Sequence, residues 1–149
     1  MAYGTKLAYF ATIEDAERHA LDCAYYPQGA SPCGFLYRVE AVSYSYIIDA
    51  DYEEYGSTAP ALELQAYGVR NWTTYGATLS IYSGARPKWV DLRPGAKQWA
   101  SRSAREAVEQ FAARRKRQLY VLEGQMLRAR HELQLAEGLR MTGAQPICP

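Results

Sequence analysis

Apolar and polar residues alternate along much of the first 95 residues, and this alternation predicts a small antiparallel sheet. The strongest signal covers residues 34–49, where apolar side chains at every second position, beginning with Phe35, Tyr37 and Val39, would line one face of a sheet. The other expected strands cover residues 6–11, 62–72, 77–82 and 88–92. Hairpin-length links between the later strands favour antiparallel pairing.

One short helix is expected between the first two strands. Thr12 can accept a hydrogen bond from the free amides of a first helical turn, and Glu14 and Asp15 suit the positive end of the helix dipole. The helix should end near Ala24, and the polar, acidic segment 49–60 is expected to be a loop. The fold class that follows is α+β, a mostly antiparallel sheet of about five strands with one short helix.

The last third of the chain is expected to be a long C-terminal α-helix. Ser103 and Glu106 form a capping box, and no proline follows until Pro146, so the helix should reach about Arg140. Such a helix is on the order of 55 Å long, whereas a globule of this size is about 30–35 Å across. We therefore expect a single domain, with the sheet in residues 1–95 and a helix in residues 101–140 that either protrudes or kinks at Gly124.

Two apolar stripes on this helix indicate two different contacts. Ala104, Val108 and Phe111 share one face and are expected to pack on the chain's own sheet. Farther along, apolar residues step by three and four in the heptad pattern of a coiled coil; they are Leu119, Leu122, Met126, Ala129, Leu133 and Ala136. We expect this seam to join the helix to a second copy of the chain in a homo-oligomer. The alternative is a helical hairpin that turns at Gly124 and folds back on the same domain.

The charge is divided unevenly along the chain, although the formal net charge is only +1. Residues 1–60 contain three basic and nine acidic residues, a net charge of −6, and residues 61–149 contain 14 basic and seven acidic residues, a net charge of +7. Opposite charges in the two parts favour self-association, and the near-neutral total argues against a general DNA-binding protein. The 13 tyrosines suit half-buried strands and surfaces that stack on a flat ligand.

The cysteines indicate a reducing compartment. Cys23, Cys33 and Cys148 include no C-x-x-C pair, so neither a zinc site nor a disulfide scaffold is expected. Reduced thiols fit a cytoplasmic protein, in the host cytoplasm if a phage encodes the chain. No apolar run approaches the length of about 18 residues that a membrane helix needs, and no signal peptide is recognisable, so neither secretion nor a membrane partner is expected.

No catalytic constellation is recognisable, and we predict neither catalytic residues, a metal site nor a cofactor. His19 has Asp22 and Cys23 three and four residues later, a spacing that also describes an ordinary helix face. The carboxylates of residues 49–54 lack the glycine and the closing glutamate of a calcium loop, which favours a solvated loop over the alternatives of a metal site or a docking patch for the basic helix. An enzyme is therefore the least favoured class of protein.

Two groups of residues have the chemistry of a ligand site. Because the chain has no glycine-rich phosphate loop, arginines would have to hold a phosphate, and Arg114 and Arg117 share a helical face on which they can do so or simply remain solvated. Near a strand end the sequence gathers planar cations, an amide and aromatic rings; the residues are Arg70, Asn71, Trp72, Tyr75 and Arg86. These are the groups that a nucleobase site needs, although a hairpin with a packed tryptophan would have the same sequence.

Two classes of function remain after these exclusions. The first is a non-enzymatic oligomeric protein that sequesters a small phosphate-bearing, nucleotide-like ligand. The second is a protein that binds a macromolecule, either as an inhibitor of a nucleic-acid-handling complex or as a structural assembly protein.

In outline, the whole chain resembles the phage anti-Thoeris signal-sequestering proteins. The resemblance rests on an antiparallel sheet followed by a long C-terminal helix, on Arg114 and Arg117, and on Asn71, Trp72 and Tyr75, and no specific motif supports it. It implies an oligomeric counter-defence protein that sequesters cyclic ADP-ribose isomers. Small phage anti-CRISPR proteins, which would bind a host defence protein, are the alternative, because they are also compact, rich in tyrosine and partly acidic.

Overall fold

The main sheet is built around one long strand, β5 (Ala61–Trp72), in the computed structural model, which describes residues 4–27, 30–82, 84 and 86–142. The first half of β5 pairs with β1 (Thr5–Lys6) and β2 (Phe35–Val42), and its second half pairs with β6 (Gly76–Leu79), which in turn pairs with β7 (Lys88–Asp91). All these pairs are antiparallel. The α+β class predicted from the sequence is therefore confirmed, with a five-stranded sheet, a short helix and a long C-terminal helix.

One face of the sheet is covered by the short helix α1 (Ile13–Asp22). The predicted cap is confirmed, because the Thr12 hydroxyl accepts a hydrogen bond of 3.1 Å from the amide of Asp15. The helix buries Ala16 and Ala20. They pack against a row of buried side chains from the two central strands, namely Tyr37, Val39, Leu64 and Ala66.

The first turns of α2 (Ala104–Thr142) belong to the same core. Ala104 and Ala107 are buried there, and Val108 and Phe111 pack beside them, so the first apolar stripe of the helix has its predicted contact. The Ser103 hydroxyl accepts from the amide of Glu106 at 3.2 Å, as the capping box predicted.

Two carboxylates of α1 also hold the beginning of α2. The Glu17 carboxylate accepts from the amide of Ala104 at 3.1 Å, and Glu14 forms an ion pair of 2.6 Å with Arg105. Both carboxylates lie at the positive end of the α2 dipole, where negative charge is stabilising.

The opposite face of the sheet has a second core. Its buried side chains are Leu36, Tyr67, Val69, Ala77, Leu79, Val90, Leu92 and Ala100. Trp99 covers part of this core, with its ring centroid 5.2 Å from that of Tyr67. The Arg38 guanidinium and the Lys88 ammonium lie 4.5 and 4.8 Å from the Trp99 ring, which is cation–π geometry. The central strands β2 and β5 therefore carry buried apolar side chains on both faces.

The first strand is shorter than the sequence predicts. Only Thr5 and Lys6 pair with β5, and residues Leu7–Tyr9 form a 3-10 helix instead of continuing the strand to residue 11. Leu7 and Phe10 pack against the first core. The strand prediction was wrong here because an apolar run this short fits a buried turn as well as a strand.

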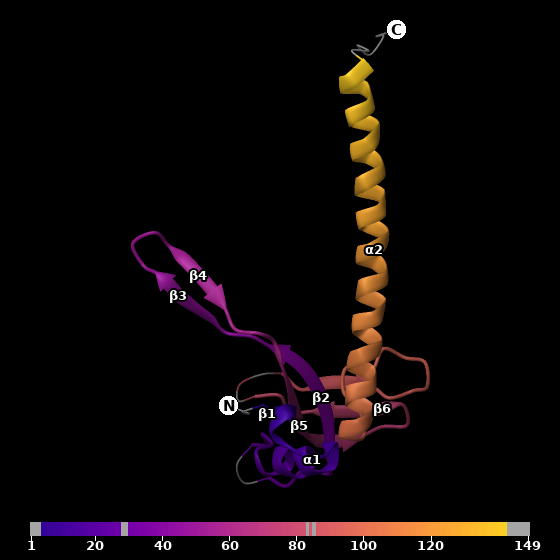
Figure 1. Ribbon diagram of the computed structural model, residues 1–149. Helices are drawn as coiled ribbons and strands as arrows, with labels where there is room; N and C mark the ends of the chain where they lie inside the picture. Colours follow the sequence, from indigo (N-terminus) through magenta and orange to yellow (C-terminus); the bar gives the residue numbers. More distant parts are fainter. Residues whose placement is uncertain (1–3, 28–29, 83, 85, 143–149) are drawn as a thin grey trace. The chain divides into compact units, whose positions relative to one another are not determined.

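The expected strand over residues 34–49 is divided between two sheets. After β2, a separate two-stranded sheet forms from β3 (Ser45–Asp49) and β4 (Glu54–Ser57) (Figure 1). The loop predicted over residues 49–60 is therefore wrong in part, because Tyr55 and Gly56 pair with Ile47 and Tyr46. The acidic residues of this segment led to the prediction of a loop, although the tyrosine and serine of β4 are compatible with strand pairing.

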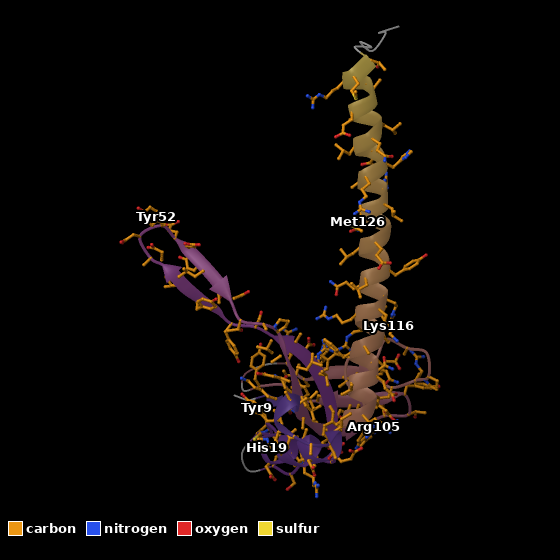
Figure 2. All side chains as sticks on the ribbon, in the orientation of Figure 1. Tyr9, His19, Tyr52, Arg105, Lys116 and Met126 are labelled. Carbon is orange, nitrogen blue, oxygen red and sulfur yellow. The ribbon has the colours of Figure 1, made fainter. Side chains whose placement is uncertain are left out.

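The chain divides into two compact units, Met1–Phe111 and Ala112–Pro149. In the second unit, α2 continues without interruption through Gly124, so neither the kink nor the helical hairpin considered at this glycine is present. All side chains from residue 115 to residue 142 are exposed. Figure 2 shows them standing away from the helix along its length, with Met126 labelled. Along the described residues, no helix combines the length and apolar character needed to cross a membrane.

Substitution of Leu64 by alanine tests the central position of β5. Leu64 is 0% exposed in the first core, so we expect L64A to lower the free energy of unfolding by about 2–5 kcal/mol. Leu62, on the same strand, is 37% exposed, and L62A should cost about 1 kcal/mol or less. Urea denaturation of the two variants measures the difference, and equal losses would contradict this description of the core.

Candidate ligand-binding surface

A row of three polar and aromatic side chains crosses the sheet where β5, β6 and β7 lie side by side. Asn71 pairs with Thr78, and Thr78 pairs with Trp89. Directly paired residues of an antiparallel sheet present their side chains on the same face. The row lies on the face opposite the second core, because Leu79, which follows Thr78, is buried in that core. We call Asn71, Thr78 and Trp89 the cross-strand row.

Trp89 gives the cross-strand row a flat aromatic surface. Trp89 is 49% exposed. Gly76 allows the ring to lie close to the backbone, because a Cβ at this position would be 3.1 Å from Cζ2 of Trp89 and 2.0 Å from the backbone oxygen of Val90. The indole therefore rests on the sheet and leaves its other side open to solvent.

An aromatic–cation pair lies beside the row. Asp91 follows Trp89 on the same face of β7 and accepts hydrogen bonds of 3.1 and 2.6 Å from the Arg93 side chain. The same guanidinium lies 5.3 Å from the ring of Tyr75 in the β5–β6 turn. The Arg93 hydrogen bonds hold the pKa of the Asp91 carboxyl below its usual range. Tyr75 and Arg93 thus add a stacking face and a fixed cation to the surface.

Trp72 is not part of this surface. It pairs with Ala77, which is buried in the second core, so it lies on the opposite face from its neighbour Asn71. Its indole nitrogen donates to the backbone oxygen of Cys33 at 3.0 Å, and the Arg102 guanidinium lies 5.7 Å from its ring. The structure therefore separates Asn71 and Trp72, which the sequence analysis placed in one site.

The two other arginines predicted near the strand end have different surroundings. Arg70 lies at a break in the β5–β6 register, and its Nε donates to the Ser80 hydroxyl at 2.6 Å. Arg86 precedes β7, whereas the β5–β6 turn with Tyr75 is at the far end of the β6–β7 hairpin. Four residue pairs separate the two ends, which is on the order of 14 Å along the strands. Arg86 is therefore separated from Tyr75, with which the sequence grouped it.

Arg114 and Arg117 lie on α2 in the second unit. Arg114 is half-buried and Arg117 is exposed. The phosphate-binding role that we expect for this pair stays a prediction.

The remaining candidate groups have structural contacts. A ring nitrogen of His19 is 3.0 Å from the Thr5 hydroxyl, and its ring packs on Phe10 with centroids 5.2 Å apart. Cys23 caps the end of α1, and Cys33 is exposed, whereas Cys148 lies outside the described residues. Within the described part of the chain, no three His, Cys, Asp or Glu side chains gather closely enough to hold a metal ion.

Sequence reasoning missed Thr78, Trp89 and Arg93. The alternation of β6 and β7 predicts which residues share a face, but the register that brings Trp89 beside Thr78 and Asn71 depends on how the strands pair. The register break at Arg70 also reverses the faces of the residues that follow it, which the sequence signals only by Gly68.

Replacement of Arg93 by glutamine tests the electrostatics of this surface. R93Q removes the side-chain hydrogen bonds to Asp91 but keeps the one of 2.9 Å from the backbone amide, so the carboxyl pKa should rise part of the way toward its ordinary value of 3.8. Because the pKa of Asp91 is lowered in the folded state, its ionised carboxylate stabilises the fold at pH values above 3.8. This stabilisation is lost as the pH falls through the lowered folded-state pKa. An NMR titration of the Asp91 side chain measures the change, with K97Q as an exposed control. An unchanged pKa in R93Q would contradict the assigned contact.

Known proteins provide no family for this chain. Comparison with protein-family models, with curated proteins and with solved structures finds no match.

Proposed function

We propose that this protein is a non-enzymatic binding protein that sequesters a small, planar, phosphate-bearing ligand of the nucleotide class. The observation that supports the proposal most directly is the exposed Trp89 ring, which lies in one cross-strand row with Asn71 and Thr78. Such a row offers a stacking face and hydrogen-bonding groups on one side of a rigid sheet.

The chemistry of the row fits a nucleobase. Stacking of a base on an aromatic side chain is worth about 1–3 kcal/mol. The Asn71 amide can both donate and accept, so it can read the polar edge of a base, and the Thr78 hydroxyl lies between the amide and the ring. Arg93, beside Tyr75, supplies a cation for a phosphate at the margin of the surface. An amide, a hydroxyl and an indole bind such a ligand without needing to react with it.

A counter-defence role follows if the ligand is a signal of a host defence system. In that role the protein would lower the concentration of free signal by binding it, as the resemblance to the anti-Thoeris signal-sequestering proteins implies. Sequestration needs tight binding and a sufficient amount of protein, and it needs no catalytic step.

The β3–β4 hairpin favours a second candidate function, the binding of a host protein. Six large apolar side chains are exposed on or beside this two-stranded sheet: Tyr44, Tyr46, Ile47, Ile48, Tyr52 and Tyr55. A two-stranded hairpin is only marginally stable by itself in water, and exposed apolar groups with a polar rim are typical of protein contacts. Acidic residues between and within the strands would favour a basic partner. This candidate corresponds to an inhibitor or an assembly protein.

A thermal-shift experiment with cyclic nucleotides and ADP-ribose isomers tests the proposal. A ligand at 100 times its dissociation constant should stabilise the protein by about 2.7 kcal/mol, which is on the order of 5–10 °C in Tm for a chain of this size. W89A and N71A should each abolish most of the shift, because they remove the stacking face and the amide. Y82A, which removes an exposed aromatic ring outside the cross-strand row, should not.

The thermal-shift experiment and a retention assay together separate the two candidate functions. Absence of a shift with every compound would overturn the ligand proposal. Specific retention of a host protein by the wild type but not by an I47S/Y55S variant would then favour the hairpin as the functional surface.

A further inference from the structure

The second half of α2 exposes an apolar seam that nothing in the described chain covers. Leu119, Leu122, Met126 and Leu133 are 47–57% exposed, and Ala129 and Ala136 complete the heptad spacing between and after them. Residues 112–142 form about 46 Å of uninterrupted helix. An exposed helix of this length with a regular apolar seam is typical of a coiled-coil partner.

We propose that this seam binds a second copy of the chain in antiparallel orientation, with Met126 opposite Ala129 of the second copy. The inference goes beyond the ligand proposal and depends on none of the residues of the cross-strand row. It rests on the side-chain sizes along the seam, on the charges beside the seam, and on the like-charge contacts that other registers and orientations would create.

Side-chain sizes match in the antiparallel register. With Met126 opposite Ala129, Leu119 lies opposite Ala136 and Leu122 lies opposite Leu133, and each layer occurs twice by symmetry. Large side chains then face small ones in four of the six layers, and leucines face each other in the other two. A parallel pair in register would place each seam residue opposite the same residue of the second copy, so four layers would hold two large side chains and two layers would hold only alanines. Even filling favours the antiparallel pair.

The charges beside the seam match in the same register. Glu123 lies opposite Arg130 of the second copy, and Lys116 lies opposite Glu137, again twice each by symmetry. Within one helix, neither Glu123 nor Arg130 has a charged residue three or four positions away. Neither takes part in an ion pair among the described residues. These two charges therefore have complementary partners only in the second copy.

Other pairings bring like charges together. A shift of one heptad in one direction places Glu123 opposite Glu123 of the second copy, and a shift in the other direction places Arg130 opposite Arg130. A parallel pair in register places Glu132 beside Glu137 of the second copy. Repulsion in the alternatives is how coiled coils specify orientation and register.

The ends of the seam fit the second unit of the chain. In the proposed register Thr142 lies opposite Ala113 of the second copy, so the pairing uses residues 113–142 and stays within the unit Ala112–Pro149. Arg115 and Arg140 occupy the next heptad positions and face each other at the two ends. Their long side chains can reach solvent there, and they limit the apolar seam to residues 119–136.

Charge reversal in the full-length protein tests both the partner and the register. Sedimentation of the wild type should give a mass twice the 16.8 kDa of one chain. E123R and R130E each turn two attractive contacts into repulsive ones, so each should weaken the dimer on the order of tenfold or more. An equimolar mixture of E123R and R130E should form a heterodimer, and the double variant E123R/R130E should again form a homodimer, because both restore opposite charges.

Matched controls separate the seam from the rest of the helix. L122E should dissociate the dimer, whereas L127E, which changes an exposed leucine outside the seam, should leave it intact. Circular dichroism of each variant shows whether the helix is retained. A monomeric wild type at all concentrations would overturn self-association. A dimeric wild type whose mass is unchanged in E123R and R130E, or single variants that do not recombine, would overturn the antiparallel register.

Neither failure would bear on the ligand-binding proposal, whose test depends on Trp89 and Asn71. A ligand-induced rise in Tm in a monomeric protein would leave the proposed function in place and remove only the dimer.

Discussion

Backbone pairing of β5 is the constraint on which the rest of the first unit depends. Three strands pair directly with it, and the fourth, β7, is attached through β6. Its alternating side chains also connect the two cores, because Leu64 and Ala66 belong to one and Tyr67 and Val69 belong to the other. The register break near Arg70 then turns Asn71 toward the face on which Thr78 and Trp89 lie. The candidate surface is thus a consequence of how this one strand pairs.

Elements with a strong period or a clear cap could be predicted from the sequence. The Thr12 cap, the Ser103–Glu106 capping box and the alternation of β2 and β5 are local signals, and the structure contains all of them. The 3-10 helix after Lys6 and the β3–β4 hairpin were missed because their local sequences are ambiguous, and pairing with a distant segment decides between the alternatives. Gly124 was considered a kink, yet a single glycine costs a helix little when no neighbouring group forces a bend.

The candidate surface was harder to predict than the fold. The sequence identified Asn71 and Tyr75 by their chemistry, but it grouped them with Trp72, which lies on the other face, and with Arg86, which lies at the other end of a hairpin. Proximity along the chain was the wrong guide, because neighbours in a strand point in opposite directions. Trp89 was missed because it shares a row with Asn71 only through the pairing of β5 with β6 and of β6 with β7. No local sequence pattern encodes both registers.

We propose two roles for this protein: its sheet presents a flat binding surface, and the exposed seam of α2 pairs with a second copy of itself. The distance between spin labels in the two copies measures the second claim most directly. The variant M141C, with the native cysteines replaced by serine, carries one label in each copy. In the proposed register residue 141 lies opposite residue 114 of the second copy, so the two labels are 27 residue positions apart along the paired helices. Pulsed electron paramagnetic resonance should then give a distance of about 40 Å. A distance below about 20 Å would mean a parallel pair, and no measurable dipolar coupling at concentrations where a dimer forms would also contradict the antiparallel register.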